Sequence, residues 1–331
     1  MRIGIIGAGG IAHHHVAALR RHSDVAITSV VDLDPSAAHD LAARTGADVV
    51  GSVTELVDRV DAVYVLTPPS ARVSIIEQTL AAGRPVLCEK PLAATVEDGR
   101  QIAQLVEAAG VPFMMGFMRR WHQPYRDLHR LVGSGALGRT LQIVRTRGGT
   151  VRPAPGNWRI DPDRRCGVTM ESLSHDIDLL RWLGGEIATA VGATVESRPD
   201  LPGFDDNVAA AVRFTGGGLG TLQLSWTSAV GYNQTAVLGE RGAAVVGGED
   251  MWTSTALRSR TGEAAEERTE YPAAIAGDMG YDGETSAFLE LVRGAERADA
   301  PTVRDGLATL VVAHAILDAA DALAPPTDIL G

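Results

Sequence analysis

The sequence contains little cysteine. Only Cys88 and Cys166 occur in 331 residues, and their separation matches no metal-binding spacing. Two cysteines in a chain of this length do not form a disulfide framework, so we expect a reducing, cytoplasmic location. Cys88 ends the apolar run 85–88 with no histidine nearby in sequence. We therefore expect a buried strand residue there and not a nucleophile.

Long apolar runs and long basic runs are also missing. No apolar stretch approaches the roughly 20 residues of a membrane span, and the N-terminus carries one charge before an apolar strand, unlike a signal peptide. The net charge of −11 argues against nucleic acid or an anionic membrane surface as the main partner. A hydrophobic content of 45% in 331 residues is instead typical of a globular protein with two domains.

The first 32 residues carry the clearest functional pattern. An apolar strand over 2–6 runs into the glycine-rich segment 7–12, a helix-like segment follows, and a second apolar strand over 26–31 ends in Asp32. This order of strand, glycine turn, helix, strand and acid is the fingerprint of dinucleotide binding. Gly7 permits the tight turn, and Gly9 allows the backbone to approach a pyrophosphate. The N–H groups at the helix start then face the phosphates.

Asp32 also bears on the choice of cofactor. It lies 20 residues after Ala12, close to the usual spacing for an acid that binds ribose hydroxyls. A carboxylate there accepts hydrogen bonds from both hydroxyls and repels a 2′-phosphate. NAD is therefore favoured, and NADP remains possible because Arg44 or another distant base could soften that preference.

The first third of the chain alternates strands and helices, which predicts a doubly wound parallel sheet. After the first two strands we expect strands over 61–67, 84–88 and 112–117, with helices over 70–82 and 95–109. This pattern ends near Met118. We accordingly place a Rossmann domain that binds NAD(P) at 1–118 and a substrate and oligomerisation domain at 119–331.

The remainder of the chain predicts an α+β domain with a large, open and mostly antiparallel sheet. Its expected strands, joined by short turns, are 141–147, 188–196, 208–214, 219–227 and 234–238. One helix over 169–183 interrupts them. We expect a solvated loop or hairpin over 258–268, and a final helix over 303–323 that packs against an earlier element.

Two groups of residues suggest chemistry. Lys90 follows an expected strand end, where side chains of a parallel sheet face the cofactor crevice. Glu171, His175 and Asp178 are spaced by four and three residues, which places them on one face of the expected helix. A histidine flanked by carboxylates can act as a general base near neutral pH.

Two groups of residues could suggest a metal site. Glu171 and His175 could hold an ion, but the sequence marks no third ligand, and alcohol oxidation with NAD needs no metal. Consecutive histidines at 13–15 point in different directions on a helix, so they make a poor metal site. We expect no metal, and we place His15 at the edge of the crevice.

These residues together resemble the Gfo/Idh/MocA oxidoreductases, and the likeness covers essentially the whole chain. It is carried by the glycine-rich run with His15 and by the segments Thr67–Pro69, Glu89–Pro91, Gly116–Trp121, Asn157–Arg159, His175–Gly184, Gly239–Gly242 and Asp305–Gly306. Within it, Lys90 matches the catalytic lysine and His175 the catalytic histidine. Glu171 falls where many members carry aspartate, and Arg72 replaces a histidine common in the family.

The resemblance implies an NAD(P)-dependent enzyme acting on a sugar, a cyclitol such as an inositol, or a related polyol. It also implies a homo-oligomer, a dimer or tetramer, that associates through the C-terminal sheet. The cofactor-binding residues expected are Gly7, Gly9, Gly10, Ile11, Asp32, Thr67, Pro68, Glu89, Lys90 and Arg159. The residues expected to bind substrate are Lys90, Arg120, Trp121, Trp158, Glu171 and His175, with Arg159 and Tyr281 as further candidates.

The expected reaction interconverts a secondary hydroxyl and a ketone. His175, oriented by Glu171, takes the hydroxyl proton, and Lys90 hydrogen-bonds the same oxygen; the two roles could be exchanged. Two alternatives stay open at this point. One is an NAD-dependent glycosidase that retains its cofactor, and the other is a non-catalytic regulator that binds NAD or a sugar.

Overall fold

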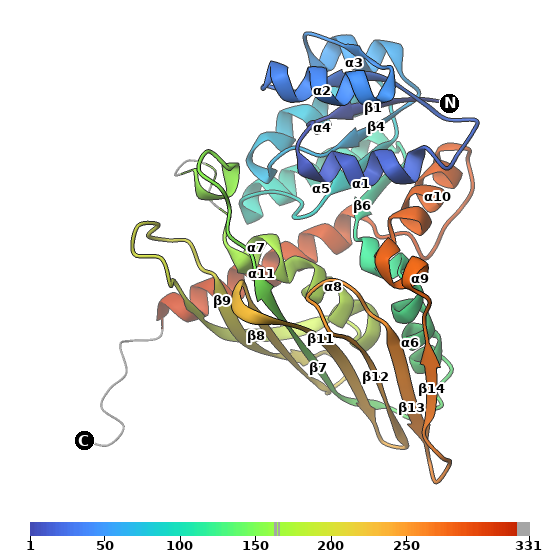
Figure 1. Cartoon of the computed structure of the whole chain (residues 1–331), viewed down its shortest axis with the longest axis vertical. Coiled ribbons are helices and arrows are strands. Elements are labelled where there is room, and N and C mark those ends of the chain that lie inside the picture. Colours follow the sequence, from blue (N-terminus) through green and yellow to red (C-terminus); the bar gives the residue numbers. More distant parts are fainter. Residues whose placement is uncertain (162–163, 165, 323–331) are drawn as a thin grey trace. The chain divides into compact units, whose positions relative to one another are not determined.

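The computed structural model of the chain describes residues 1–161, 164 and 166–322. It divides into two compact units (Figure 1). The first contains Met1–Met118 and Gly280–Leu310, and the second contains the described residues of 119–279 and of 311–322. The last helix, α11 (Val303–Ala322), therefore contributes to both units. Leu323, the expected end of that helix, lies outside the described residues.

The first unit contains a sheet of six parallel strands. These are β1 (Arg2–Ile6), β2 (Ala26–Val31), β3 (Asp48–Val49), β4 (Ala62–Val65), β5 (Val86–Glu89) and β6 (Phe113–Gly116). Their order is β3-β2-β1-β4-β5-β6, and every neighbouring pair is parallel. This is the strand order of the Rossmann fold, so the predicted fold class is confirmed for this unit. The order reverses between β1 and β4, where such sheets bind their ligands.

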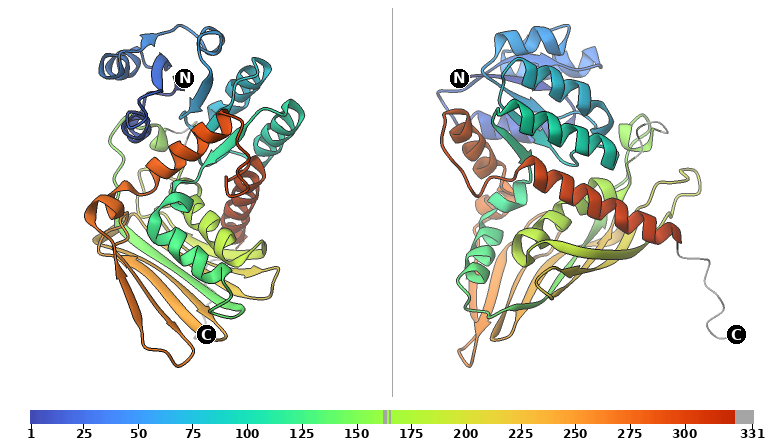
Figure 2. Two further views of the ribbon diagram at one scale, coloured as in Figure 1. Left: turned by 90° about the vertical axis from the view of Figure 1, so that its right-hand side faces the viewer. Right: turned by 180° about the vertical axis from the view of Figure 1, so that it is seen from behind.

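Helices lie on both faces of this sheet (Figure 2). They are α1 (Gly10–Leu19), α2 (Pro35–Thr45), α3 (Val53–Arg59), α4 (Arg72–Ala81) preceded by η1 (Pro69–Ala71), and α5 (Val96–Ala109). Their ends follow local sequence signals. Thr95 caps α5 by accepting the N–H of Asp98, and Gly110 ends that helix in the left-handed conformation. A further helix, α10 (Tyr281–Val292), packs against α1.

The second unit contains an eight-stranded sheet in the order β14-β13-β12-β11-β7-β10-β9-β8. Its strands are β7 (Thr140–Thr150), β8 (Ile187–Val195), β9 (Asn207–Phe214), β10 (Leu219–Ser225), β11 (Thr227–Gly239), β12 (Gly242–Gly248), β13 (Ala256–Thr261) and β14 (Glu267–Glu270). Only the β7–β10 pair is parallel among the pairs of this sheet that the structure describes. The expected mostly antiparallel sheet is confirmed, and the segment 258–268 forms the β13–β14 hairpin.

One face of this sheet is covered by helices. These are α6 (Gln123–Gly133), which packs on β12 and β13, and α8 (Leu173–Gly184), which packs on β7 and β10. The unit also contains η2 (Met118–Trp121), η3 (Trp158–Ile160), α7 (Val168–Glu171) and α9 (Ala273–Asp278). The single helix expected over 169–183 was wrong in one respect, because it is divided at Ser172 into α7 and α8.

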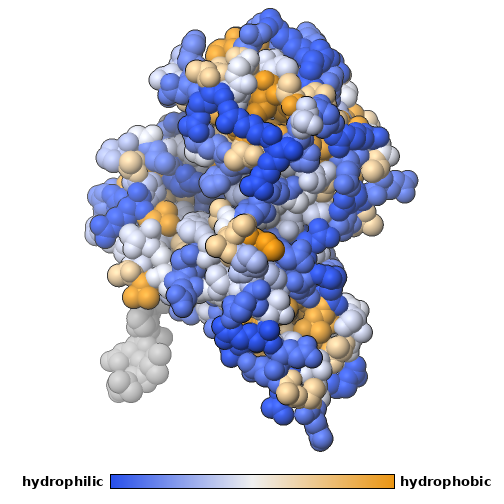
Figure 3. Space-filling view, turned by 45° about the vertical axis from the view of Figure 1, so that its right-hand side comes forward, coloured by the Kyte–Doolittle hydropathy of each residue, from blue (hydrophilic) through white to orange (hydrophobic). Residues whose placement is uncertain are grey.

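The other face of the sheet exposes small and apolar side chains along β8 and β9. Val191 and Val195 are 59% and 58% exposed, and they pair with Ala211 and Asn207 on the neighbouring strand. On the face drawn in Figure 3 the surface is mainly hydrophilic, and its apolar side chains form small separate patches. No helix in the described part of the chain is long and apolar enough to cross a membrane.

Candidate active site

The glycine turn between β1 and α1 has the shape that a dinucleotide requires. Gly7 has a φ of +99°, and a Cβ there would lie 2.9 Å from the backbone nitrogen of Thr67. A Cβ at Gly9 or Gly10 would find no described atom within 4 Å. Space is therefore open over the turn, and no side chain of the described residues caps the start of α1. The residues present fit a pyrophosphate at this helix N-terminus.

Asp32 and Thr67 flank this turn. Asp32 accepts the N–H of Ala8 on Oδ2 at 2.6 Å and the N–H of Asp34 on Oδ1 at 2.8 Å. Each carboxylate oxygen keeps acceptor capacity for a ribose hydroxyl. The Oγ1 of Thr67 is buried without a hydrogen-bond partner in the described part of the chain, so a ligand could supply one. Leu33 follows Asp32 and is 94% exposed, and it was not among the predicted site residues.

Lys90 follows β5 in a turn that Arg72 holds in place. The buried guanidinium of Arg72 donates to the carbonyl oxygen of Thr67 at 2.7 Å, and also to those of Glu89 and Pro91. Arg72, whose replacement of a family histidine was unexplained from sequence, thus fixes the backbone on both sides of Lys90.

Two residues near this turn are buried. His15 is fully buried and does not lie at an open edge of the crevice. Glu89, one of the expected cofactor-binding residues, is also buried, and its carboxylate lies 2.9 Å from the imidazole of His15. Both side chains belong to the interior of the first unit because α10 packs over α1. The sequence pattern did not predict α10.

In the second unit, Glu171 and His175 lie on either side of the break between α7 and α8. Arg147 on β7 holds this break, donating to the carbonyl oxygen of Ser172 at 2.6 Å and to its Oγ at 2.9 Å. Glu171 forms an ion pair with Arg159 at 2.7 Å. His175 lies in the first turn of α8 and is only 6% exposed.

Asp178 has a structural partner. Its carboxylate accepts two hydrogen bonds from the guanidinium of Arg120, at 2.9 and 2.6 Å, and both side chains are buried. Arg120 and Asp178 therefore form a buried bidentate pair, and the substrate contact expected of Arg120 stays a prediction.

A group of buried arginines surrounds Asp176, and sequence reasoning missed it. Nε of Arg145 and Nε of Arg147 donate to the two oxygens of Asp176 at 2.8 and 2.7 Å. Burial by itself would raise the pKa of Asp176, but the charges of Arg145, Arg147 and Arg119 outweigh it and lower that pKa to about 2. The alternation of side chains along a strand could have predicted that Arg145 and Arg147 lie together, since positions 145 and 147 of β7 face the same side of the sheet.

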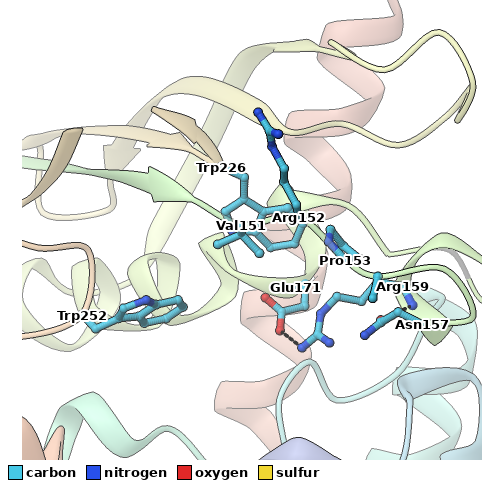
Figure 4. Close-up of a pocket in the computed structure, with 9 residues that line it drawn as sticks. Val151, Arg152, Pro153, Asn157, Arg159, Glu171, Trp226 and Trp252 are labelled. Carbon is cyan, nitrogen blue, oxygen red and sulfur yellow. Dashed lines mark hydrogen bonds and ion pairs between the residues drawn. The ribbon is translucent and has the colours of Figure 1, made fainter. Parts of the chain in front are cut away.

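A pocket of about 300 Å³ opens beside the α7–α8 break (Figure 4). It is lined by Val151, Arg152, Pro153, Ala154, Asn157, Arg159, Glu171, Trp226 and Trp252. The Glu171–Arg159 ion pair lies at its wall, and the indole rings of Trp226 and Trp252 supply apolar surfaces. A lining that combines apolar and aromatic surfaces with polar groups fits a small polar molecule.

Trp121, Trp158 and Tyr281, which were also expected to bind substrate, are not among the residues that line this pocket. Trp121 is buried with the guanidinium of Arg126 over its ring, and Trp158 packs against Arg159. Tyr281 belongs to the first unit and contacts the rings of His14 and His15. Of the residues expected to bind substrate, Glu171 and Arg159 line the pocket. Trp226 and Trp252 were not predicted, because an isolated tryptophan gives no sequence signal for its surroundings.

A Rossmann unit that fits a dinucleotide, joined to a unit with a polar and aromatic pocket, defines a dinucleotide-dependent oxidoreductase. Residues 1–117 match the family described as "Oxidoreductase family, NAD-binding Rossmann fold", and residues 125–245 match the GFO/IDH/MocA C-terminal domain. The chain belongs to the Gfo/Idh/MocA family of NAD-binding oxidoreductases, as its motifs indicated.

Several similar proteins are inositol dehydrogenases. A myo-inositol dehydrogenase of Streptomyces leeuwenhoekii is 38% identical over 73% of this chain and 75% of its own. An inositol 2-dehydrogenase of Rubrobacter xylanophilus is 31% identical over 95% of this chain and 89% of its own. The crystal structure of a putative myo-inositol dehydrogenase of Sinorhizobium meliloti is 24% identical, covers 97% of both chains and has a TM-score of 0.81, which shows the shared fold.

Proposed function

We propose that this protein is an NAD-dependent dehydrogenase that interconverts a secondary hydroxyl and a ketone on an inositol-like cyclitol or a related sugar. The pocket of Glu171, Arg159, Trp226 and Trp252 carries this proposal. Its polar groups can hydrogen-bond to hydroxyls, and its indole rings can pack on the C–H faces of a ring. The names of the two relatives above support the cyclitol as the first substrate to test.

Lys90, His175 and Glu171 are proposed to move the proton. Bound NAD would supply the acceptor for the hydride. His175 takes the hydroxyl proton, and Lys90 hydrogen-bonds the same oxygen and stabilises its developing charge. Glu171 directly precedes the helix break that places His175, and its ion pair with Arg159 lies at the wall of the pocket. Either Lys90 or His175 can serve as the acceptor in this scheme.

The experiment that tests the proposal measures reduced nicotinamide with a panel of inositols, aldoses and amino sugars, each with NAD and with NADP. We expect the wild-type protein to reduce NAD with an inositol. Lys90→Met and His175→Gln should each lose roughly 10²–10⁴-fold in kcat while still binding NAD. Wild-type-like turnover in either variant would remove that residue from the mechanism, and a failure of every polyol to reduce either cofactor would refute the activity.

A further inference from the structure

Helix α7 is a single short turn, yet its last residue, Glu171, lines the pocket. Within this turn the N–H of Glu171 donates to the carbonyl oxygen of Gly167 at 2.9 Å, and the N–H of Ser172 donates to that of Val168 at 3.0 Å. One turn of helix is unfavourable by itself, because few hydrogen bonds offset the ordering of its backbone. The position of Glu171 therefore depends on the contacts that hold α7 from outside.

Asp205 holds the start of α7. Its carbonyl oxygen accepts the N–H of Val168 at 2.8 Å. Oδ2 of its carboxylate accepts the N–H of Thr169 at 2.9 Å and the hydroxyl of Thr169 at 2.5 Å. The first N–H groups of a helix have no partner within it, and Gly167 at the N-cap position has no side chain to accept them. Asp205 supplies this cap from a segment 36 residues away from Thr169.

The segment that contains Asp205 is itself joined to the eight-stranded sheet. The next residue, Asp206, donates its N–H to the carbonyl oxygen of Val195 on β8 at 3.0 Å. The carbonyl oxygen of Asp206 accepts the N–H of Trp226 at 2.9 Å, and Trp226 also lines the pocket. One segment of chain therefore supports Trp226 directly and Glu171 through α7.

Gly167 leaves the space that the carboxylate of Asp205 occupies. A Cβ at position 167 would overlap Oδ1 of Asp205 and would lie 2.6 Å from its carbonyl oxygen. The backbone of Gly167 has a φ of −77°, which any residue can adopt, so glycine is required here for space. A side chain at this position would push Asp205 away from Thr169.

The contact between Asp205 and Thr169 needs an acceptor and not a charge. Asp205 is 7% exposed, Thr169 is fully buried, and both hydrogen-bond donors are neutral. Burial raises the pKa of Asp205, and the hydrogen bonds from Thr169 offset only part of that effect. An amide oxygen can accept the same two hydrogen bonds. Asparagine should therefore replace Asp205, in contrast to Asp176, whose charge is paired with two arginines.

We propose that Asp205 is a positioning residue, which anchors α7 through Thr169 and so fixes Glu171 in the wall of the pocket. This inference rests on the proposed function, in which Glu171 takes part in the proton transfer. Asp205 itself touches neither substrate nor cofactor in this scheme. Because Arg147 holds the break at Ser172, α7 is fixed at both of its ends.

Substitutions on both sides of the contact test this role. A misplaced Glu171 should lower kcat/KM for an inositol about 100-fold in Asp205→Ala, with the affinity for NAD within about threefold of wild type. Gly167→Ala should show a comparable loss, because its Cβ displaces the carboxylate. Thr169→Val keeps the N–H but removes the hydroxyl, so its loss should be intermediate. Asp205→Asn should stay close to wild type. Thr95→Ala, which removes the cap of α5 in the first unit, is the matched control and should leave kcat/KM unchanged.

A double-substitution cycle distinguishes positioning from a general loss of stability. If Asp205 acts through Glu171, Asp205→Ala should cost less than about threefold in kcat/KM once Glu171→Ala is present. Losses that multiply independently would overturn the inference. Equal losses in Asp205→Ala and Asp205→Asn would overturn it as well, and so would wild-type kcat/KM in Asp205→Ala. Calorimetry of each variant identifies any that does not fold, and Thr169→Val then replaces Asp205→Ala in the cycle.

Amide hydrogen exchange of the full-length protein separates this inference from the proposed function. The amides of residues 168–171 should exchange about tenfold faster in Asp205→Ala, the effect of a lost cap, and at the wild-type rate in Asp205→Asn. Unchanged exchange in Asp205→Ala would refute the anchor even in an active dehydrogenase. Faster exchange in a protein that oxidises no polyol would support the anchor while the proposed function fails.

Discussion

Replacing Asp176 with asparagine should destabilise the second unit strongly. The carboxylate accepts hydrogen bonds from Arg145 and Arg147 at 2.8 and 2.7 Å, and all three side chains are at most 1% exposed. Asp176→Asn leaves both guanidinium groups buried without their counter-charge. Breaking a buried ion pair from one side typically costs about 3–5 kcal/mol. At roughly 2–4 °C per kcal/mol for a domain of this size, the melting temperature should fall by roughly 6–20 °C.

Differential scanning calorimetry checks this value, with Asp200→Asn as the control. Asp200 forms a comparable ion pair with Arg198 at 2.7 Å, but on the surface, so its loss should leave the melting temperature unchanged. Asp176→Asn should also lower kcat, because Arg147 holds the helix break at Ser172. A melting temperature within about 2 °C of wild type would refute the reasoning on the buried arginines.

The ion pairs of Asp176 also make the stability of the folded protein depend on pH. The pKa of Asp176 is lowered from 3.8 to about 2 in the folded protein, so its contribution is complete above about pH 4 and is lost as the pH falls towards 2. The shift corresponds to roughly 2 kcal/mol. Denaturant titrations between pH 5 and pH 2 should show a smaller loss of stability in Asp176→Asn than in wild type, and parallel losses would contradict this assignment.

Three further predictions concern the cofactor, the pocket and the assembly. Asp32→Ala should raise the use of NADP relative to NAD, measured as the ratio of kcat/KM, and an unchanged ratio would remove Asp32 from cofactor selection. Trp252→Ala should raise the KM for the polyol roughly tenfold with little change in kcat, the effect of an aromatic contact worth about 1.4 kcal/mol. Ala211→Arg, on the exposed face of β9, should reduce the mass seen by light scattering if the protein associates through this sheet; an unchanged oligomer would place the interface elsewhere.

Much of the first unit could be predicted because its signals are local. The glycine turn, the apolar strands and the caps at Thr95 and Gly110 each depend on residues adjacent in sequence. What was missed there comes from a distant part of the chain. Helix α10 follows residues 119–279 of the second unit and packs on α1, near the buried His15 and Glu89, and the sequence contains no short-range signal for that return.

The second unit was harder because its key contacts join residues far apart in sequence. His175 and Glu171 are predictions from their motifs, whereas the pairing of Arg120 with Asp178, across 58 residues, had no sequence signal. Arg145 and Arg147 occupy strand positions that a charged residue rarely fills, and the facing Asp176 supplies the opposite charge that offsets their burial. Sequence motifs identify chemical groups well, but which charges pair is decided by packing.

A double-substitution cycle on Lys90 and His175 tests the central claim most directly. NAD reduction with an inositol is measured for wild type, Lys90→Met, His175→Gln and the double variant. If both side chains act on the same hydroxyl in one proton-transfer step, the double variant should lose about as much kcat as the worse single variant. Losses that multiply independently, or an inositol-dependent rate that survives in the double variant, would contradict the account.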